Sequence, residues 1–327
     1  MKILYAAGTP LAGVAELMAR LVNEYHSGTH KAAVLSRGPG KHSWYVRPGI
    51  KFKRWNVKDK NQCREACEWA DVIHCMANVG SRNLKVPDLL RKRVWVFQWH
   101  GAEIGGLNAA FFPEDYEHVR WIHIGQGWVE RQQSYFEGFK RYGFRVVPNL
   151  ISADDPIHKP RPWNSRVKGR IAFAPSNVKP KAVNKKGVHE VRRACQNAYD
   201  LDLIMACTFE ECMRRKQVAC LGIDEVVTPM YHRSGLEFLA QGTPCICSYS
   251  PEAERILKDA TGASEMPFLQ ASSENLRQVI GRQLSLSESE QEEQGKKARQ
   301  WIDTYYHPKE LLKRHLDVYE NGPKRSH

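Results

Sequence analysis

Apolar runs that alternate with amphipathic segments predict a repeated strand–helix pattern along the chain. Residues 2–7 form an apolar run typical of a strand, and residues 14–25 place apolar side chains at helical spacing on one face. Further strands are expected at 32–36, 71–75, 94–99, 121–124 and 145–147, with helices such as 63–69 between them. Strands separated by helices in this way are typical of a doubly wound α/β sheet.

The second half of the chain repeats this scheme. Strands are expected at 170–174, 202–207, 225–227 and 245–248, and helices at 186–198, 208–220 and 234–241. A proline-rich polar stretch at 149–162 predicts a linker between two domains. Residues 285–294 are acidic and predict a solvated helix face, and residues 296–319 predict a helix pair broken at Pro308. We therefore expect domains at 1–152 and 153–300, followed by C-terminal helices at 301–327.

Residues 231–248 carry the most informative local pattern, because a polar loop leads into a short helix, a Gly-Thr-Pro turn and a strand. The helix is expected to begin at Ser234 or Gly235 and to carry Glu237 in its first turn. Its unpaired N–H groups suit a phosphate group, and Glu237 suits hydroxyl groups such as those of a ribose. The alternative is an ordinary surface helix whose glutamate favours the helix dipole.

Three other segments offer candidate binding groups. The loop from Gly8 to Gly13 follows the first strand and can bring backbone close to a ligand, although ordinary strand–helix turns also contain glycines. His100 follows the apolar strand 94–99 and can bond a ligand hydroxyl, or it can simply cap backbone groups. Lysines at 179, 181, 185 and 186 can neutralise phosphate groups, or they can form an idle charged surface.

The order of these motifs resembles that of glycosyltransferases with the GT-B fold, of the family 4 type. Glu237-Phe-Leu-Ala-Gln-Gly-Thr-Pro-Cys245 is similar to the end of the family's nucleotide-sugar-binding signature, and His100-Gly-Ala-Glu103 to its His-Gly loop. Val147-Pro-Asn149 resembles the interdomain Val-Pro-Asn, and Ala174-Pro-Ser-Asn177 with Lys186-Gly187 resembles the donor-phosphate segment. These motifs span nearly the whole chain, and their order makes the match more specific than any one of them.

The resemblance implies two facing Rossmann-like domains, with the C-terminal helices crossing back to the first. It implies a nucleotide-sugar donor, such as a UDP-sugar, held with Glu237 on the ribose and Lys186 on the diphosphate. His100 would lie beside the reacting sugar, and Glu103 would hold that loop or touch the sugar. The remaining implied donor contacts are Gly13, Ser176, Asn177, Tyr231, His232, Ser234 and Gly235. Transfer with retention, no cofactor and no essential metal are also implied.

Two positions depart from the family pattern. Pro229 stands where the first of two glutamates is common, and His232 stands where a glycine is common. The missing glutamate leaves the identity of the sugar open. A catalytically silent relative is a further alternative, against which His100, Lys186 and Glu237 argue.

Charge bears on the acceptor. The chain has a net charge of +13, and residues 1–150 hold 22 Lys and Arg against 13 Asp and Glu, a net of +9. Lys51, Lys53, Arg54 and Trp55 mix cations with aromatic rings, which suits a polyanion such as an anionic membrane surface or nucleic acid. The alternative is a basic surface without a partner.

Composition favours a globular protein, with 42% hydrophobic and 26% charged residues, and no apolar run is long enough to span a membrane. We expect a mature chain that begins at Met1 and a cytoplasmic protein, peripheral at a membrane surface or in a host cytoplasm if a phage encodes it. Nine cysteines lack a Cys-x-x-Cys pair, so reduced thiols are simpler than a metal site at Cys63, Cys67 and Cys75.

The sequence therefore predicts a glycosyltransferase that acts on an envelope glycan or lipid. One alternative is a bacteriophage-type glycosyltransferase that modifies a base in DNA. The other is a non-catalytic nucleic-acid-binding protein on the same scaffold. The oligomeric state is left open.

Overall fold

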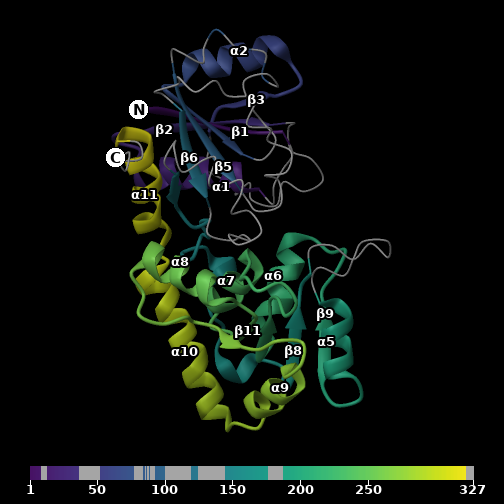
Figure 1. Ribbon diagram of the computed structural model, residues 1–327. Helices are drawn as coiled ribbons and strands as arrows, with labels where there is room; N and C mark the ends of the chain where they lie inside the picture. Colours follow the sequence, from purple (N-terminus) through teal and green to yellow (C-terminus); the bar gives the residue numbers. More distant parts are fainter. Residues whose placement is uncertain are drawn as a thin grey trace. The chain divides into compact units, whose positions relative to one another are not determined.

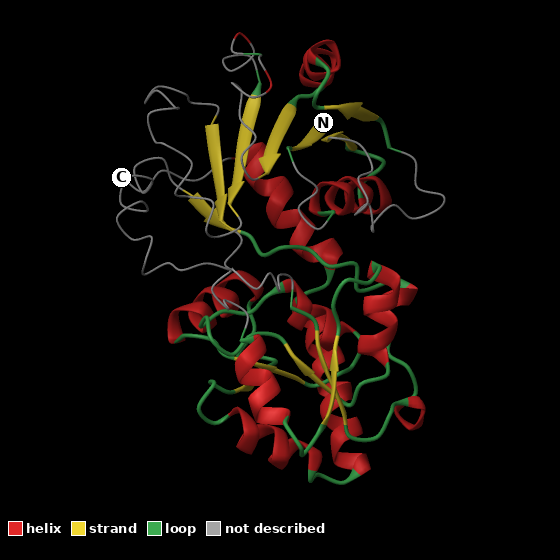
Figure 2. Cartoon of the chain, turned by 90° about the vertical axis from the view of Figure 1, so that its right-hand side faces the viewer, coloured by secondary structure: helices red, strands yellow, loops and turns green. Residues whose placement is uncertain are grey.

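The computed structural model describes residues 1–8, 13–36, 52–76, 84, 86, 88, 93–99, 119–123, 144–175 and 187–321. The chain divides into two compact units, one formed by Met1–Leu150 with Pro308–His327 and the other by Ile151–His307. Each unit contains one parallel sheet with helices against it (Figures 1 and 2). This is the doubly wound α/β architecture that the alternating pattern predicts.

The sheet of the first unit has the strand order β3-β2-β1-β4-β5-β6-β7, and every described pair is parallel. Its interior strand β1 is buried from Ile3 to Ala7, as expected of a strand covered on both faces. The strands are β1 (Lys2–Ala7), β2 (Lys31–Ser36), β3 (Arg54–Asn56), β4 (Val72–Met76), β5 (Val94–Trp99), β6 (Val119–His123) and β7 (Phe144–Val146).

Alternate residues of β1 face different helices. Leu4 and Ala6 belong to a core that includes helix α2 (Lys60–Trp69). The hydroxyl of Tyr5 instead accepts a hydrogen bond from Tyr319 of the C-terminal helix α11 (Pro308–Asn321) at 3.3 Å. That helix also packs on α1 (Val14–Tyr25). The C-terminal helix therefore completes the core of the first unit, in agreement with the fold that the sequence motifs imply.

The sheet of the second unit has the order β12-β11-β10-β8-β9 and is also parallel throughout its described pairs. Figure 2 shows red helices on both sides of its yellow strands. Its strands are β8 (Arg170–Phe173), β9 (Asp200–Leu203), β10 (Leu221–Ile223), β11 (Cys245–Cys247) and β12 (Leu269–Gln270).

One face of this second sheet packs against α5 (Val188–Cys195) and α9 (Leu276–Leu284), whose apolar residues share a core with the strands. Helix α7 (Arg233–Ala240) packs over β10, since a Cβ on Gly222 would lie only 2.5 Å from the ring of Phe238. Helices α6 (Phe209–Gln217) and α10 (Glu288–Tyr305) pack against α7. The remaining elements are α8 (Pro251–Thr261) and the 3₁₀ turns Pro156–His158 and Trp163–Ser165.

The strand order reverses at one place in each sheet. In the first sheet β1 lies between β2 and β4, and in the second β8 lies between β9 and β10. Ligands of doubly wound sheets bind beyond the carboxyl ends of strands at such reversals. The loops that follow β1, β8 and β10 are therefore the places where a ligand is expected.

The structure corrects the expected domain limits. Helix α10 belongs to the second unit as a whole, because it packs along α7, and the chain passes to the first unit only at Pro308. The expected linker is also partly built into the second unit. Ile151, Ala153 and His158 are buried, and the side-chain amide of Gln217 donates to two carbonyl oxygens of this stretch.

Several expected elements shift or are missing. The strand expected at 225–227 is wrong, since β10 ends at Ile223. The strand expected at 202–207 lies at Asp200–Leu203, and Ala206 beyond it adopts a left-handed φ of 52° that no strand residue adopts. Strand β3 was not expected. Helix α7 begins one residue before the expected start, so Glu237 lies beyond its first turn.

Candidate functional site

Two buried carboxylates shape the loop that follows β10. Asp224 and Glu225 come directly after the strand, and their exposed fractions are 5% and 0%. One oxygen of Glu225 accepts hydrogen bonds from the backbone N–H groups of Val226, Val227 and Thr228, at 3.0, 2.8 and 3.1 Å. Because these amides are already occupied, they cannot extend the sheet, and the strand ends.

Asp224 fixes the start of α7. Its Oδ2 accepts a hydrogen bond from the backbone N–H of His232, the N-cap residue, at 2.5 Å. A Cβ on Gly235 would lie 2.8 Å from the same oxygen, so the absent side chain lets the first turn approach the carboxylate. The imidazole of His232 does not cap the helix. The N-terminus of α7 therefore follows the carboxyl end of β10 without a cap from the His232 side chain, and a helix start of this kind favours an anion.

A buried ion pair joins α7 to α6. Nζ of Lys216 lies 2.7 Å from Oε2 of Glu237, and the side chains are 1% and 8% exposed. Nε of Arg233 lies 3.2 Å from the other carboxylate oxygen. Burial opposes the charge on both partners, but the opposite charges and hydrogen bonds around each of them together outweigh it, so the pKa of Lys216 is raised and that of Glu237 is lowered. Glu237 is therefore an ionised hydrogen-bond acceptor.

The hydroxyl of Ser234 belongs to the same cluster. Its Oγ lies 2.8 Å from Nζ of Lys216, and the Ser234 carbonyl oxygen lies 3.3 Å from it. Ser234 and Glu237 are three positions apart on α7, which places them on the same side of the helix. A helix N-terminus beside an ionised carboxylate suits a ligand that carries both phosphate and hydroxyl groups.

Two expected donor contacts lie on either side of this start. The side chain of Tyr231 is fully buried and stacks on Phe268, with ring centroids 5.9 Å apart. The core encloses this ring, and the expected contact of Tyr231 with a donor stays a prediction. The imidazole Nδ1 of His232 lies 3.8 Å from Asp224, and a quarter of the His232 side chain is exposed.

Gly13 has the backbone freedom that its expected role requires. It caps α1 with a left-handed φ of 70°, and its carbonyl accepts the first helical hydrogen bond, from Leu17. A side chain at this position would strain the backbone. Gly13 thus lies at the end of the loop that follows β1, where a ligand of the first sheet is expected.

The expected acceptor cluster lies largely on β3. Trp55 is 3% exposed and packs on Trp69, with ring centroids 5.5 Å apart, so its ring is a core residue and the expected stacking on an acceptor is wrong. Lys53 lies 2.8 Å from a carboxylate oxygen of Glu65, and a nitrogen of Arg54 lies 3.6 Å from one of Glu16. The cations remain near the surface, but they are engaged in ion pairs.

Six expected site residues lie outside the residues that the structure describes. They are His100, Glu103, Lys51, Ser176, Asn177 and Lys186. Their expected roles stay predictions.

Sequence reasoning missed Lys216, Asp224 and Glu225. Lys216 carried one signal, since it falls three positions after the buried Met213 and so on the apolar face of α6. A lysine on such a face needs a buried partner. The two acidic residues could have been found as a pair directly after an apolar strand.

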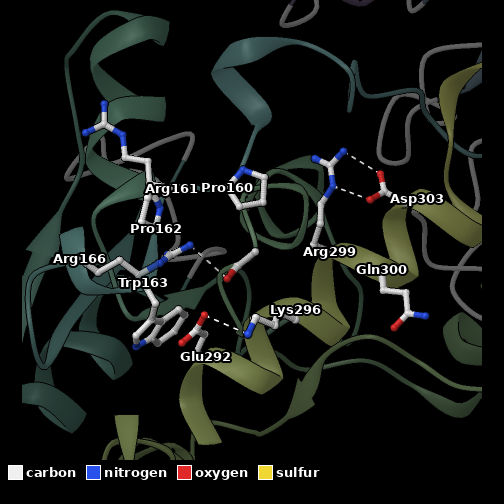
Figure 3. Close-up of a pocket in the computed structure, with 12 residues that line it drawn as sticks. Pro160, Arg161, Pro162, Trp163, Arg166, Glu292, Lys296, Arg299, Gln300 and Asp303 are labelled. Atoms are coloured by element: carbon white, nitrogen blue, oxygen red, sulfur yellow. Dashed lines mark hydrogen bonds and ion pairs between the residues drawn. The ribbon is translucent and has the colours of Figure 1, made fainter. Parts of the chain in front are cut away.

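A cavity of about 440 Å³ in the second unit lies elsewhere, between α10 and the stretch that precedes β8 (Figure 3). Its wall includes Arg166, whose guanidinium donates to carbonyl oxygens of Ala219, Gln241 and Gly242. These carbonyls precede β10 and β11, so the cavity lies at the amino edge of the sheet, opposite the loop after β10. Arg299 donates likewise to Ala240 at the end of α7. Both arginines are therefore structural.

The thiols and other metal-binding side chains do not assemble into a site in the described part of the chain. All nine cysteines are free, and seven are buried. No group of three His, Cys, Asp or Glu side chains positioned to hold a metal ion occurs among the described residues.

Comparisons with protein-family models and with curated protein sequences gave no match. Solved structures do match. Anabaena HepE in complex with UDP has a TM-score of 0.61 at 12% identity, over 98% of this chain and 100% of its own. An α-glucosyltransferase in complex with UDP-glucose and DNA containing an abasic site has a TM-score of 0.72 at 8% identity, over 98% and 99%. A glycosyltransferase from Rickettsia africae ESF-5 has a TM-score of 0.64 at 11% identity, over 98% and 97%. Over nearly its whole length, the chain therefore has the fold of the GT-B glycosyltransferases.

Proposed function

We propose that the protein is a glycosyltransferase that moves a sugar from a nucleotide-sugar donor to an acceptor. The observation that carries this proposal is the start of α7, where a helix N-terminus that the His232 side chain does not cap adjoins the ionised carboxylate of Glu237. Helix α7 follows β10 along the chain, and β10 lies next to β8, the strand at which the strand order reverses. The matching structures that contain UDP or UDP-glucose have the same fold, which supports a donor of this class.

In the proposed complex, the donor diphosphate lies at the N-terminus of α7 and the ribose hydroxyls donate to Glu237. The helix N–H groups stabilise the negative charge that develops on the departing nucleotide. For Lys186 and His100 we propose the roles that the sequence motifs imply, on the diphosphate and on the reacting sugar. Fixed side chains then act by orienting the donor and stabilising the leaving group, without a metal. We propose transfer with retention.

Position 229 in the loop after β10 bears on how a sugar is recognised. Pro229, where a glutamate is common in the resembled family, has no side-chain hydrogen-bonding group. Its carbonyl oxygen accepts a hydrogen bond from the N–H of Ser250 at 3.0 Å, which fixes the loop. Sugar hydroxyls must therefore be recognised by groups other than the side chain at position 229, and we propose no particular sugar.

For the acceptor we propose a polyanion or an anionic surface, with an envelope glycan or lipid as the first candidate. The net charge of +9 in residues 1–150 supports attraction to such a partner. No described helix combines the length and apolarity needed to cross a membrane. Attraction to an anionic surface by charge should weaken as salt is raised.

A modified base in DNA is the second candidate acceptor. The observation that favours it is the match to α-glucosyltransferase structures that contain DNA, with TM-scores of 0.72 and 0.71. A basic first unit also suits a phosphate backbone. If DNA is the acceptor, binding to duplex DNA should fall steeply with salt, and transfer should require the modified base.

A screen of nucleotide sugars by thermal shift tests the proposal. A donor at a hundred times its dissociation constant stabilises a protein by about 2.7 kcal/mol, which is a readily measured rise in melting temperature. Transfer is then assayed with the binding donor on lipid, glycan and DNA acceptors. A protein that binds nucleic acid but neither binds nor hydrolyses any nucleotide sugar would instead be a non-catalytic protein on this scaffold.

A further inference from the structure

A single lysine of α6 reaches the start of α7 from inside the second unit. Lys216 is 1% exposed, and its Nζ lies 2.7 Å from Oε2 of Glu237, 2.8 Å from Oγ of Ser234 and 3.3 Å from the Ser234 carbonyl oxygen. The ring of Phe238 covers it, with the centroid 4.6 Å from Nζ. An ammonium has three hydrogens, and here it has three acceptors. Lys216 is therefore enclosed and acts only through its two neighbours.

The contact with Lys216 decides what Ser234 can offer a ligand. An ammonium only donates, so Oγ of Ser234 accepts this hydrogen bond. The hydroxyl hydrogen of Ser234 is then left to donate elsewhere. Beside the N-terminus of α7, such a donor suits a phosphate oxygen.

The same ammonium decides the state and orientation of Glu237. Lys216 holds one carboxylate oxygen and Arg233 holds the other, which fixes the plane of the carboxylate. Burial would raise the pKa of Glu237, and the attraction of Lys216 is the main cause that lowers it instead. Each carboxylate oxygen still has lone pairs for hydroxyl groups of a ligand.

We propose that Lys216 is a positioning residue of the donor site, which keeps Glu237 ionised for the ribose and turns the Ser234 hydroxyl into a donor for the diphosphate. The inference rests on the proposed function, since it assigns the donor to this site. It also assigns α6 a part in donor binding that neither the motifs nor the comparisons give it.

A test based on pH must consider every charged group around Glu237. Arg233 lies on its own helix and Lys216 on α6, and the charge of His158 in the 3₁₀ turn Pro156–His158 also acts on it. Asp224 and Cys212 act on the ammonium of Lys216. A variant that removes the carboxylate itself separates Glu237 from these groups.

The test compares Lys216→Met with the control variant Arg214→Met. Arg214 lies on the exposed side of the same helix, and the ion pair described for it is with Glu211. UDP-glucose is the probe, because its diphosphate keeps its charge at neutral and mildly acidic pH. The unchanged protein and Arg214→Met should bind it equally from about pH 8 to about pH 5.5. Lys216→Met should bind about tenfold more weakly or worse, and its affinity should fall further as the pH is lowered and Glu237 takes up a proton.

The double variant Lys216→Met/Glu237→Gln shows whether Glu237 causes the pH effect. It should bind weakly at every pH, with the slope removed, whereas a slope that persists would assign the effect to His158 or Asp224 and overturn the inference. Circular dichroism and melting curves establish that each variant is folded. If Lys216→Met does not fold, Lys216→Arg keeps the charge and should retain most of the affinity, while Lys216→Gln should not.

The outcomes separate the inference from the proposed function. If the unchanged protein binds UDP-glucose and Lys216→Met binds it equally well at all pH values, the inference alone is refuted. If no nucleotide sugar binds the unchanged protein, the proposed function is refuted and the inference with it.

Discussion

Replacing Gly235 with alanine tests the geometry at the start of α7. The new Cβ would lie 2.8 Å from Oδ2 of Asp224 and 2.9 Å from Cε1 of Phe268. Neither neighbour can move freely, because Asp224 holds the N–H of His232 at 2.5 Å and Phe268 stacks on Tyr231. The added methyl group must therefore push the first turn of α7 away from the loop that follows β10.

The expected cost follows from two opposing effects. Overpacking a core costs about 1–3 kcal/mol, whereas alanine is favoured over glycine inside a helix by about 1 kcal/mol. Gly235→Ala should therefore be destabilised by about 0–2 kcal/mol. Gly281→Ala in α9 is the control, since its Cβ would meet only the Tyr199 hydroxyl, at 2.9 Å, the far end of a flexible side chain. That variant should gain up to about 1 kcal/mol.

Melting curves and donor affinity give the readout. The two variants should therefore differ by up to about 3 kcal/mol, and each kcal/mol corresponds to about 2–4 °C in melting temperature. Displacement of the α7 N–H groups should also weaken UDP-glucose binding by about tenfold in Gly235→Ala, and Gly281→Ala should bind normally. The reasoning fails if both alanine variants melt alike and bind the donor with the same affinity.

Three further predictions address the surroundings of the site. Arg166→Ala should lower the melting temperature by several degrees, because it leaves buried carbonyl oxygens without a donor, at about 1–3 kcal/mol each. Arg161 is exposed, so the control variant Arg161→Ala should melt at the normal temperature. Glu225→Ala leaves three backbone N–H groups without their acceptor and should weaken both donor binding and stability. Glu225→Gln keeps an acceptor oxygen at this position and should lose less of both. Equal losses in the two variants would contradict the role assigned to the Glu225 oxygen. Because the pKa of Glu237 is lowered from 4.5, its charge stabilises the fold above that pH, and the stability difference between the unchanged protein and Glu237→Gln should shrink in urea titrations below about pH 4.5.

Contiguous apolar runs predicted most of the strands. Residues 2–7 and 94–99 are strands as expected, because residues 3–7 and 95–98 are buried within a parallel sheet, and such a run needs no partner to be recognised. Strand β3 has only three residues and one apolar side chain, Trp55. It is a strand because it pairs with β2, with Val34 opposite Arg54, and no local pattern reports that pairing.

The role of Trp55 was misread for the same reason, because no local pattern reports which tertiary contacts a side chain makes. A tryptophan flanked by cations fits a nucleic-acid or membrane contact as well as a strand that turns one face to the core. Only the position of α2 over the sheet, with Trp69 against the ring, decides that Trp55 is buried.

Local chemistry located the candidate donor site in part. A glutamate three positions after a serine at a helix start, followed by a glycine turn and a strand, was enough to single out Ser234 and Glu237. The pattern predicted a helix start one residue after the observed one, and it predicted Glu237 in the first turn, whereas Glu237 lies beyond that turn. The departure arises because Asp224 binds the N–H of His232 and so makes His232 the cap, a contact across eight residues.

The sequence by itself determined the alternation of strands and helices and the residues at the start of α7, because hydrophobic period and capping chemistry act over a few neighbouring residues. The tertiary structure alone decided the electrostatics of that start. Lys216 is 21 residues away from Glu237 along the chain, and the two meet because α6 and α7 pack side by side in the second unit. A charge pair of this kind depends on burial, and burial is a property of the assembled core.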